Sequence, residues 1–201
     1  ELKKEFPDLL IIADGTQFLG TTNFDFESSA IDVLGASAYK WLLAGYGNGL
    51  MLFKDEAKNR CELKTIGFNA AGARPERKNE VRFARRFEAG HLSCLNFGSL
   101  KFSLDFLSGI GKDAIEHQNR KLAEKAKEEF NELGLLSRER VSRKANSTIF
   151  NIIGDGAIFE ELLRNDIICA QRGEGIRFGF HFYNTEEEIE AIAKILRSSM
   201  I

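Results

Sequence analysis

The sequence predicts an α/β protein in two parts: a mainly parallel sheet over residues 1–111, then a small α+β unit over residues 112–201. Three observations support this. The short, continuously apolar run at residues 9–13 is typical of a strand buried on both faces. Apolar residues at helical spacing over 115–133 predict a long amphipathic helix at the boundary. After that helix, short strands again alternate with helices.

Further elements of the first part follow from local patterns. Strands are expected at residues 31–37 and 49–53, and the glycine-rich turn at 45–49 introduces the second of them. A basic stretch at residues 74–86 is predicted to be a solvated loop with a short helix rather than an anion site. Leucines at positions 100, 104 and 107 then have the spacing of a helix.

The second part is expected to begin with a helix that Asp113 caps, with Glu116 in the same capping box, and that Gly134 ends. A final helix is expected after Thr185 and Glu188, which also suit a capping box. The remaining expected elements are strands at residues 148–153, 166–171 and 176–182 and a short helix at residues 157–163.

Composition excludes several classes of protein. A chain of 201 residues, 43% hydrophobic and 29% charged, can bury a core and is not typical of a disordered protein. The net charge of −2 leaves no strong field for nucleic acid or an anionic membrane, and no apolar run reaches the length of a bilayer crossing. Three cysteines without close spacing favour a reducing compartment. We therefore expect a cytoplasmic protein.

Two residues of the first part can act together. Asp14 ends the first strand and Lys40 follows the second, so both are expected at the carboxyl edge of the sheet, where ligands bind in open α/β folds. Taken alone, Asp14 is more typical of a plain turn, and Lys40 resembles a surface lysine. However, the apolar neighbours of Lys40 favour its nucleophilic form. Together they suit a Schiff-base cofactor, in which the lysine holds an aldehyde and the carboxylate keeps a ring nitrogen protonated.

Other kinds of site have no support in the sequence. There is no Walker A loop, and the turn at residues 45–49 lacks the spacing of a dinucleotide-binding fingerprint. His91, His117 and His181 are far apart and there is no CxxC motif, so no metal site is expected. Cys169 lies in an apolar stretch and is predicted to be a structural cysteine rather than the nucleophile of a desulfurase.

Motifs along the whole chain strengthen the cofactor hypothesis. They are DGTQ at residues 14–17, SAYKWL at 37–42, GNG at 47–49, RFEAG at 86–90 and IRFGFHFYNTEEEI at 176–189. In this order they resemble the class V aminotransferase family. That family comprises enzymes of fold type I that use pyridoxal 5′-phosphate (PLP), and it includes cysteine desulfurases and kynureninase-like lyases.

The resemblance implies a role for each matching residue. Asp14 would pair with the pyridinium nitrogen of PLP, and Gln17 would contact the phenolic oxygen of the ring. Lys40 would form the Schiff base, or internal aldimine, with the aldehyde. Ser37 and Tyr39 would bind the phosphate, although many family members have histidine at the position of Tyr39.

Two further residues are implied near the ligands. His91 stands where many family members have a threonine that reaches the phosphate of the partner subunit. Arg177 is implied to bind the α-carboxylate of the substrate. The strand pattern supports this role, because Arg177, Gly179 and His181 alternate with apolar residues that face a core. An arginine can grip a carboxylate with two parallel hydrogen bonds, but an exposed strand arginine is the alternative.

The resemblance also implies an activity. The first expectation is a PLP-dependent transaminase that acts on an α-amino acid, with a cysteine desulfurase, selenocysteine lyase or kynureninase-like lyase as the alternative. Family members are homodimers, and they carry a long segment ahead of the strand that ends at Asp14. The chain is therefore expected to be the C-terminal part of such an enzyme, with part of the large, cofactor-binding domain at residues 1–111 and the small domain at 112–201. A catalytically incompetent fragment is the remaining alternative.

Overall fold

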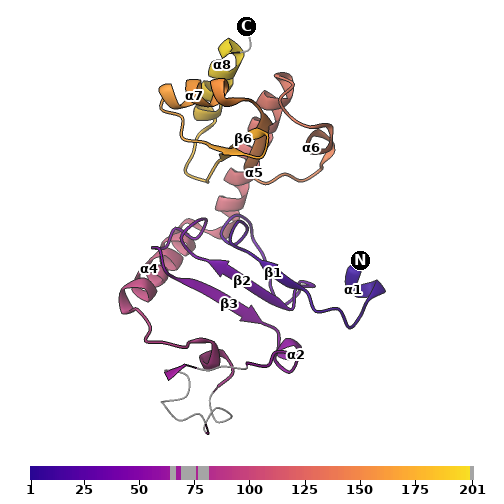
Figure 1. The fold of residues 1–201 in the computed structure, drawn as a ribbon, viewed down its shortest axis with the longest axis vertical. Helices are drawn as coiled ribbons and strands as arrows, with labels where there is room; N and C mark the ends of the chain where they lie inside the picture. The colour runs from indigo at the N-terminus through magenta and orange to yellow at the C-terminus, as the bar shows by residue number, and fades with distance from the viewer. Residues whose placement is uncertain (64–66, 69–75, 77–81, 200–201) are drawn as a thin grey trace. The chain divides into compact units, whose positions relative to one another are not determined.

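The computed structural model describes residues 1–63, 67–68, 76 and 82–199, so most of the basic stretch predicted at residues 74–86 lies outside the described residues. The chain divides into two compact units, coloured from indigo to yellow along the sequence in Figure 1. The first unit comprises residues 1–20 and 24–109, and the second comprises residues 21–23 and 110–201.

The first unit is built on a three-stranded sheet of order β1-β2-β3. Its strands are β1 (Ile12–Asp14), β2 (Val33–Ser37) and β3 (Gly49–Phe53). β1 pairs with β2 in parallel and β2 pairs with β3 in antiparallel, so the sheet is mixed rather than mainly parallel. Only β2 shows the predicted burial on both faces, with Val33 and Leu34 almost fully enclosed.

The apolar run at residues 9–13 was expected to be a strand buried on both faces, and this expectation is wrong. The strand itself is shorter, and Ile12 is 65% exposed. The cause is position, because β1 is an edge strand of the described sheet and pairs on one side only. An apolar run alone does not distinguish an edge strand from a central one.

Among its described residues, the first unit also contains helix α4 (Cys94–Ile110) and the short helical segments α1 (Leu2–Glu5), α2 (Asp55–Lys58) and η2 (Ala84–Phe87). The buried stripe of α4 consists of Leu100, Ser103 and Leu107. Leu104, which shares the predicted leucine spacing, is 41% exposed instead. A serine therefore occupies the buried face of this helix.

The second unit packs helices against a second three-stranded sheet, of order β4-β6-β5 and wholly antiparallel. Its helices are α5 (Lys112–Glu132), α6 (Arg138–Ser142), α7 (Gly156–Arg164) and α8 (Glu186–Ser199). Its strands are β4 (Ile149–Ile153), β5 (Ala170–Arg172) and β6 (Gly175–Gly179). Phe130 of α5 lies at the centre of the core, where its ring contacts Phe150 and Phe178 with centroid separations of 5.8 and 5.6 Å.

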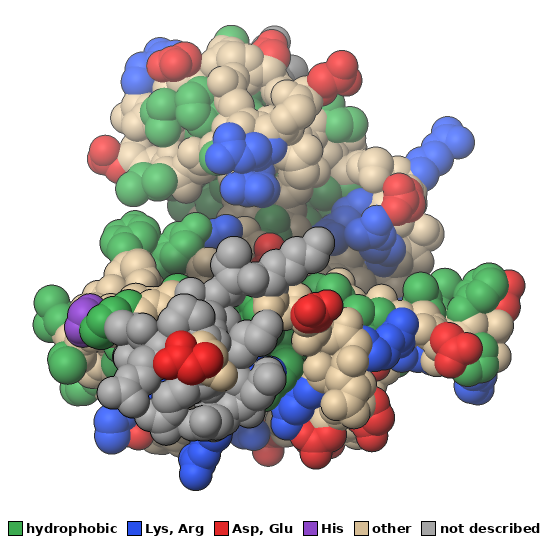
Figure 2. Space-filling model, turned by 60° about the horizontal axis from the view of Figure 1, so that its bottom comes forward, with side chains coloured by type: hydrophobic (Ala, Val, Ile, Leu, Met, Phe, Trp, Pro, Cys, Tyr) green, Lys and Arg blue, Asp and Glu red, His purple; other side chains and the backbone are tan. Residues whose placement is uncertain are grey.

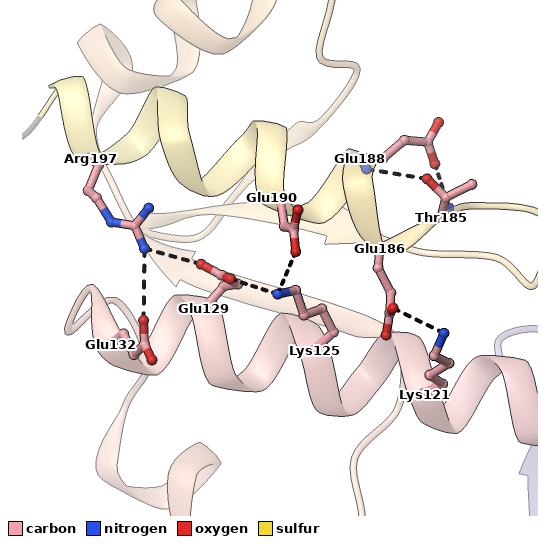
Figure 3. Close-up of polar contacts among 9 residues, drawn as sticks. All are labelled: Lys121, Lys125, Glu129, Glu132, Thr185, Glu186, Glu188, Glu190 and Arg197. Carbon is pink, nitrogen blue, oxygen red and sulfur yellow. Dashed lines mark hydrogen bonds and ion pairs between the residues drawn. The ribbon is translucent and has the colours of Figure 1, made fainter.

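The ends of α5 and α8 show which capping predictions hold. Thr185 and Glu188 form the predicted capping box of α8, with Thr185 N donating to Glu188 Oε2 at 2.9 Å (Figure 3). The cap predicted for α5 is wrong: Gly111 precedes the helix, and no side chain caps it. Asp113 and Glu116 instead accept hydrogen bonds from Asn23, because that asparagine supplies donors that compete for the carboxylates.

Ion pairs join α5 to α8 along one side (Figure 3). Lys125 lies 3.0 Å from Glu129 and 2.8 Å from Glu190, and Arg197 lies 3.2 Å from Glu129. Hydrogen bonds to Glu190 and Glu129 raise the pKa of Lys125, and the hydrogen bond from Lys125 lowers the pKa of Glu129. The carboxylate of Glu129 therefore holds two cations, one from each helix.

Basic and acidic side chains are interspersed over the face drawn in Figure 2, as a net charge near zero leads one to expect. Among the helices of the described residues, none has the length and apolar character that crossing a bilayer requires.

Candidate functional site

The candidate site lies at one edge of the first unit's sheet. β1 and β2 run in parallel and end at the same edge, β1 at Asp14 and β2 at Ser37. The chain then forms a loop over residues 38–48, which carries Lys40, before β3 begins at Gly49 opposite Ser37. This sheet therefore brings Asp14, Ser37 and the Lys40 loop to its carboxyl edge, where polar side chains are free of the strand ladder.

Asp14 is held as a carboxylate by the residue two positions further on. Thr16 N donates to Asp14 Oδ1 at 2.8 Å, an arrangement typical of an aspartate that ends a strand in a turn. Hydrogen bonds from the side chain and then the backbone of Thr16 lower the pKa of Asp14, and the positive charge of Lys40 lowers it further. Asp14 is thus ionised at neutral pH and lies within electrostatic reach of Lys40.

Thr16 also connects the two strand ends. Its Oγ1 accepts a hydrogen bond from Ser37 N at 3.0 Å, while Gly15 N donates to Gly35 O at 2.7 Å. A hydroxyl can donate and accept at once, so Thr16 bridges Asp14 and the start of the Lys40 loop. The sequence alone did not single out Thr16, although the Asp-Gly-Thr order, which favours such a turn, was the available signal.

Lys40 starts a tight turn. Leu43 N donates to Lys40 O at 2.9 Å, and Ala44 N returns to Ala38 O at 3.0 Å. Leu43 has φ +56°, a left-handed conformation that is costly for a leucine and persists only where surrounding contacts impose it. Lys40 itself is half-buried, and its Nζ lies 5.6 Å from the centre of the Tyr39 ring. The backbone around the amine is therefore fixed rather than free.

One polar face of α4 imposes that loop conformation. Ser103 Oγ donates to Leu42 O, Ser99 Oγ accepts from Gly45 N at 2.8 Å, and Asn96 Nδ2 donates to Gly47 O at 3.2 Å. These three residues, at positions i, i+3 and i+7, lie on one side of the helix. We call them the α4 latch. The leucine spacing predicts the helix but not the latch, because the polar residues at positions 96, 99 and 103 show their role only through contacts with the distant Lys40 loop.

The remaining predicted ligands of PLP differ in their surroundings. Gln17 Oε1 accepts a hydrogen bond from the Trp41 indole Nε1 at 2.7 Å. Tyr39 is exposed, with its ring 5.1 Å from that of Tyr46. His91 is exposed and stacks on Phe68 at 5.9 Å, so the structure does not join it to the group around Asp14.

Arg177 lies in the second unit, on β6 between Asn151 of β4 and Ala170 of β5. Its neighbours Ile176 and Phe178 are buried, so the predicted alternation holds along the strand. Within the described part of the chain, the Arg177 guanidinium makes no hydrogen bond or ion pair.

His181 and Cys169 of the second unit are both at least partly buried. The alternation of side chains does not continue to His181, which is buried because β6 has already ended at Gly179. Cys169 packs against the core of the second unit, and burial raises the pKa of its thiol, as suits a structural cysteine. Among the described residues, no group of three His, Cys, Asp or Glu side chains is placed to hold a metal ion.

Comparison with known proteins identifies the family. The model of the aminotransferase class-V family matches residues 1–192, and the chain therefore belongs to this family. Isopenicillin N epimerase of Amycolatopsis lactamdurans is 26% identical over 210 residues, which cover 94% of this chain and 52% of that protein. The chain spans about half the length of the curated relatives that it matches.

Solved structures share the fold. The apo cysteine desulfurase of Thermococcus onnurineus NA1 matches with a TM-score of 0.79 at 19% identity, covering 94% of this chain and 52% of that one. A mutant of the lyase C-DES, with glycine covalently linked to its PLP cofactor, matches with a TM-score of 0.70 at 16% identity, covering 90% of this chain and 49% of that one. The chain thus shares the fold of about half of each of these two structures.

Proposed function

We propose that this chain forms the PLP-binding and substrate-binding portion of an enzyme that acts on α-amino acids, with transamination as the first candidate reaction. The observation that carries the proposal is the placement of Asp14 and Lys40 at one sheet edge, because β1 ends at Asp14 and the loop that carries Lys40 follows the parallel strand β2. Membership of the class-V family supports it.

The residues at this edge fit the cofactor in their chemistry. PLP, when bound, supplies an aldehyde for an amine and a ring that withdraws electrons from the Cα of the substrate. Asp14, kept ionised by Thr16, would accept a hydrogen bond from the ring N–H of PLP and so favour the protonated state of that nitrogen. Lys40 would supply the amine that holds the aldehyde and the base that takes a proton from Cα of the substrate. The hydroxyls of Ser37 and Tyr39 are donors for the phosphate.

Arg177 completes the proposal on the substrate side. The Arg177 guanidinium makes no hydrogen bond or ion pair with the described residues, and the small residue Gly179 lies beside it, so that it can bind a carboxylate in a bidentate manner. Holding that group fixes which Cα bond is aligned for cleavage. His91 is proposed to reach the phosphate held by a second copy of the chain, so that a homodimer forms the complete site.

The reaction subtype is separate from cofactor binding. A desulfurase needs a reactive cysteine near the carboxylate-binding arginine, whereas the thiol of Cys169 is partly buried with its pKa raised. This observation favours transamination over desulfuration. A catalytically incompetent fragment remains the alternative to both.

Absorbance spectroscopy tests the proposal. PLP added to the purified chain should give a visible band that is absent in Lys40→Ala but present in Lys101→Ala, which removes an exposed lysine of α4. Arg177→Lys should keep that band and lose at least tenfold in affinity for an α-amino acid, because lysine cannot make the bidentate contact. Arg164→Lys, at the exposed end of α7, is the matched control. Equal bands in both lysine variants would refute the role of Lys40.

A further inference from the structure

Trp41 is the only tryptophan of the chain, and the proposed function so far gives it no role. It directly follows Lys40, its side chain is only 6% exposed, and its indole Nε1 lies 2.7 Å from Gln17 Oε1. We propose that Trp41 is a positioning residue that fixes which end of the Gln17 amide is presented to the cofactor. This inference rests on the proposed function, because the ligand concerned is PLP.

The hydrogen bond determines the orientation of the amide. The oxygen and nitrogen of a glutamine amide have nearly the same size, so their placement is decided by their partners. An indole N–H can only donate, and the atom 2.7 Å from it must therefore be the oxygen of Gln17. With its oxygen engaged, Gln17 has its Nε2, with two N–H groups, left to contact a ligand.

This orientation selects the chemistry of the ligand atom. An amide nitrogen donates to an oxygen that carries negative charge, and such charge-assisted bonds are stronger than neutral ones. The flipped amide would present an oxygen and repel the same atom. Trp41 thus prepares Gln17 to donate to an anionic oxygen, such as the ionised phenolic oxygen that PLP would present when bound. Because the donor is oriented before the ligand arrives, less conformational freedom is lost on binding.

The backbone makes Trp41 a rigid support. Leu43 N donates to Lys40 O, so Trp41 lies within the tight turn that Lys40 begins. Gly20 approaches the same turn so closely that a Cβ atom there would lie 2.5 Å from Trp41 O. A single turn therefore positions both the amine of Lys40 and, through the indole, the amide of Gln17. Any displacement of this turn would move the two groups together.

The hydrogen bond can be tested without cofactor. The chain has one indole N–H, which gives one resonance in a proton–nitrogen NMR spectrum. Gln17→Leu removes the acceptor and should shift that resonance upfield and speed its exchange with solvent. Gln17→Glu has a side chain of the same length that still offers an oxygen acceptor, so the indole resonance should stay close to its original position. An unchanged resonance in Gln17→Leu would overturn the inference, whatever the protein does with PLP.

Cofactor affinity tests the positioning role. Trp41→Phe, which keeps a buried ring but loses the N–H, should weaken PLP binding roughly threefold to tenfold. The same change in a Gln17→Leu background should have no further effect, because there is no amide left to orient. Gln17→Glu should also weaken PLP binding although its indole resonance is retained, because it offers no N–H donor.

The outcomes separate the two proposals. If Trp41→Phe lowers PLP affinity by the same factor in the unaltered chain and in the Gln17→Leu background, the role of Trp41 is purely structural and the inference is overturned. If the unaltered chain binds no PLP while the indole resonance responds to Gln17→Leu, the proposed function fails, and the assigned purpose of the Trp41–Gln17 pair fails with it, although the hydrogen bond itself stands.

Discussion

The α4 latch makes a quantitative prediction through Ser103. Residues Ser103 and Leu42 are 4% and 7% exposed, and the Ser103 hydroxyl donates to the carbonyl oxygen of Leu42 in a buried hydrogen bond. Ser103→Ala leaves this buried carbonyl without its donor, which costs about 1–3 kcal/mol. With a urea m-value of about 2 kcal/mol/M, a loss of 2 kcal/mol lowers the unfolding midpoint by about 1 M. The variant should also load less PLP, since Leu42 lies two residues from Lys40.

Urea unfolding followed by tryptophan fluorescence reports on the first unit, because Trp41 is the only tryptophan of the chain and lies in that unit. The matched control is Ser108→Ala, which makes the same chemical change at an exposed position of the same helix. It should alter stability by less than about 0.5 kcal/mol. If Ser103→Ala and Ser108→Ala unfold at the same urea concentration, the latch does not hold the Lys40 loop and the reasoning is wrong.

Two further predictions concern backbone fit and pH. Gly20→Ala should destabilise the first unit by more than about 2 kcal/mol, because Gly20 has φ +94° and its new Cβ would collide with Trp41 O. The control is Gly98→Ala in α4, whose new Cβ meets no atom within 4 Å. This variant should stabilise the first unit by up to about 1 kcal/mol. Equal urea midpoints would contradict this. Because the pKa of Glu129 is lowered from 4.5, its ion pairs stabilise the second unit above that pH and lose this contribution as the pH falls through the lowered value. Because the pKa of Lys125 is raised from 10.5, its contribution is complete below that pH and is lost only as the pH rises through the raised value. In calorimetric unfolding at a series of pH values, the stability of Glu129→Gln should therefore fall less steeply toward acid pH than that of the unaltered chain. An equally steep fall in both proteins would contradict the stabilising role of the Glu129 ion pairs.

Local signals predicted much of the fold. The glycine-rich turn and apolar run placed β3 at residues 49–53, where the structure has it, and Thr185 with Glu188 predicted the start of α8. The failures have a common cause. The burial of Ile12 and the cap at Asp113 depend on which segments are neighbours in space, and periodicity carries no such information.

At the candidate site, too, the features set by local sequence were predicted and those set by neighbours in space were not. The sequence predicted that Asp14 and Lys40 share a sheet edge, because parallel strands end together. It missed Thr16 and Trp41, which form hydrogen bonds with the predicted ligands Ser37 and Gln17. It also missed the α4 latch, which holds the backbone of the Lys40 loop from a helix far along the chain. All the predicted site roles stay predictions, namely those of Asp14, Gln17, Ser37, Tyr39, Lys40, His91 and Arg177. The domain roles of residues 1–111 and 112–201, the homodimer and the cytoplasmic location also stay predictions.

The central claim is that Lys40 is the amine that holds PLP, and borohydride trapping tests it most directly. PLP is added to the chain, the complex is reduced, and the digested protein is mapped by mass spectrometry. A stoichiometric adduct on Lys40 is the expected result, with no comparable labelling of the exposed Lys101. No adduct at Lys40, or equal labelling of several surface lysines, would contradict the claim.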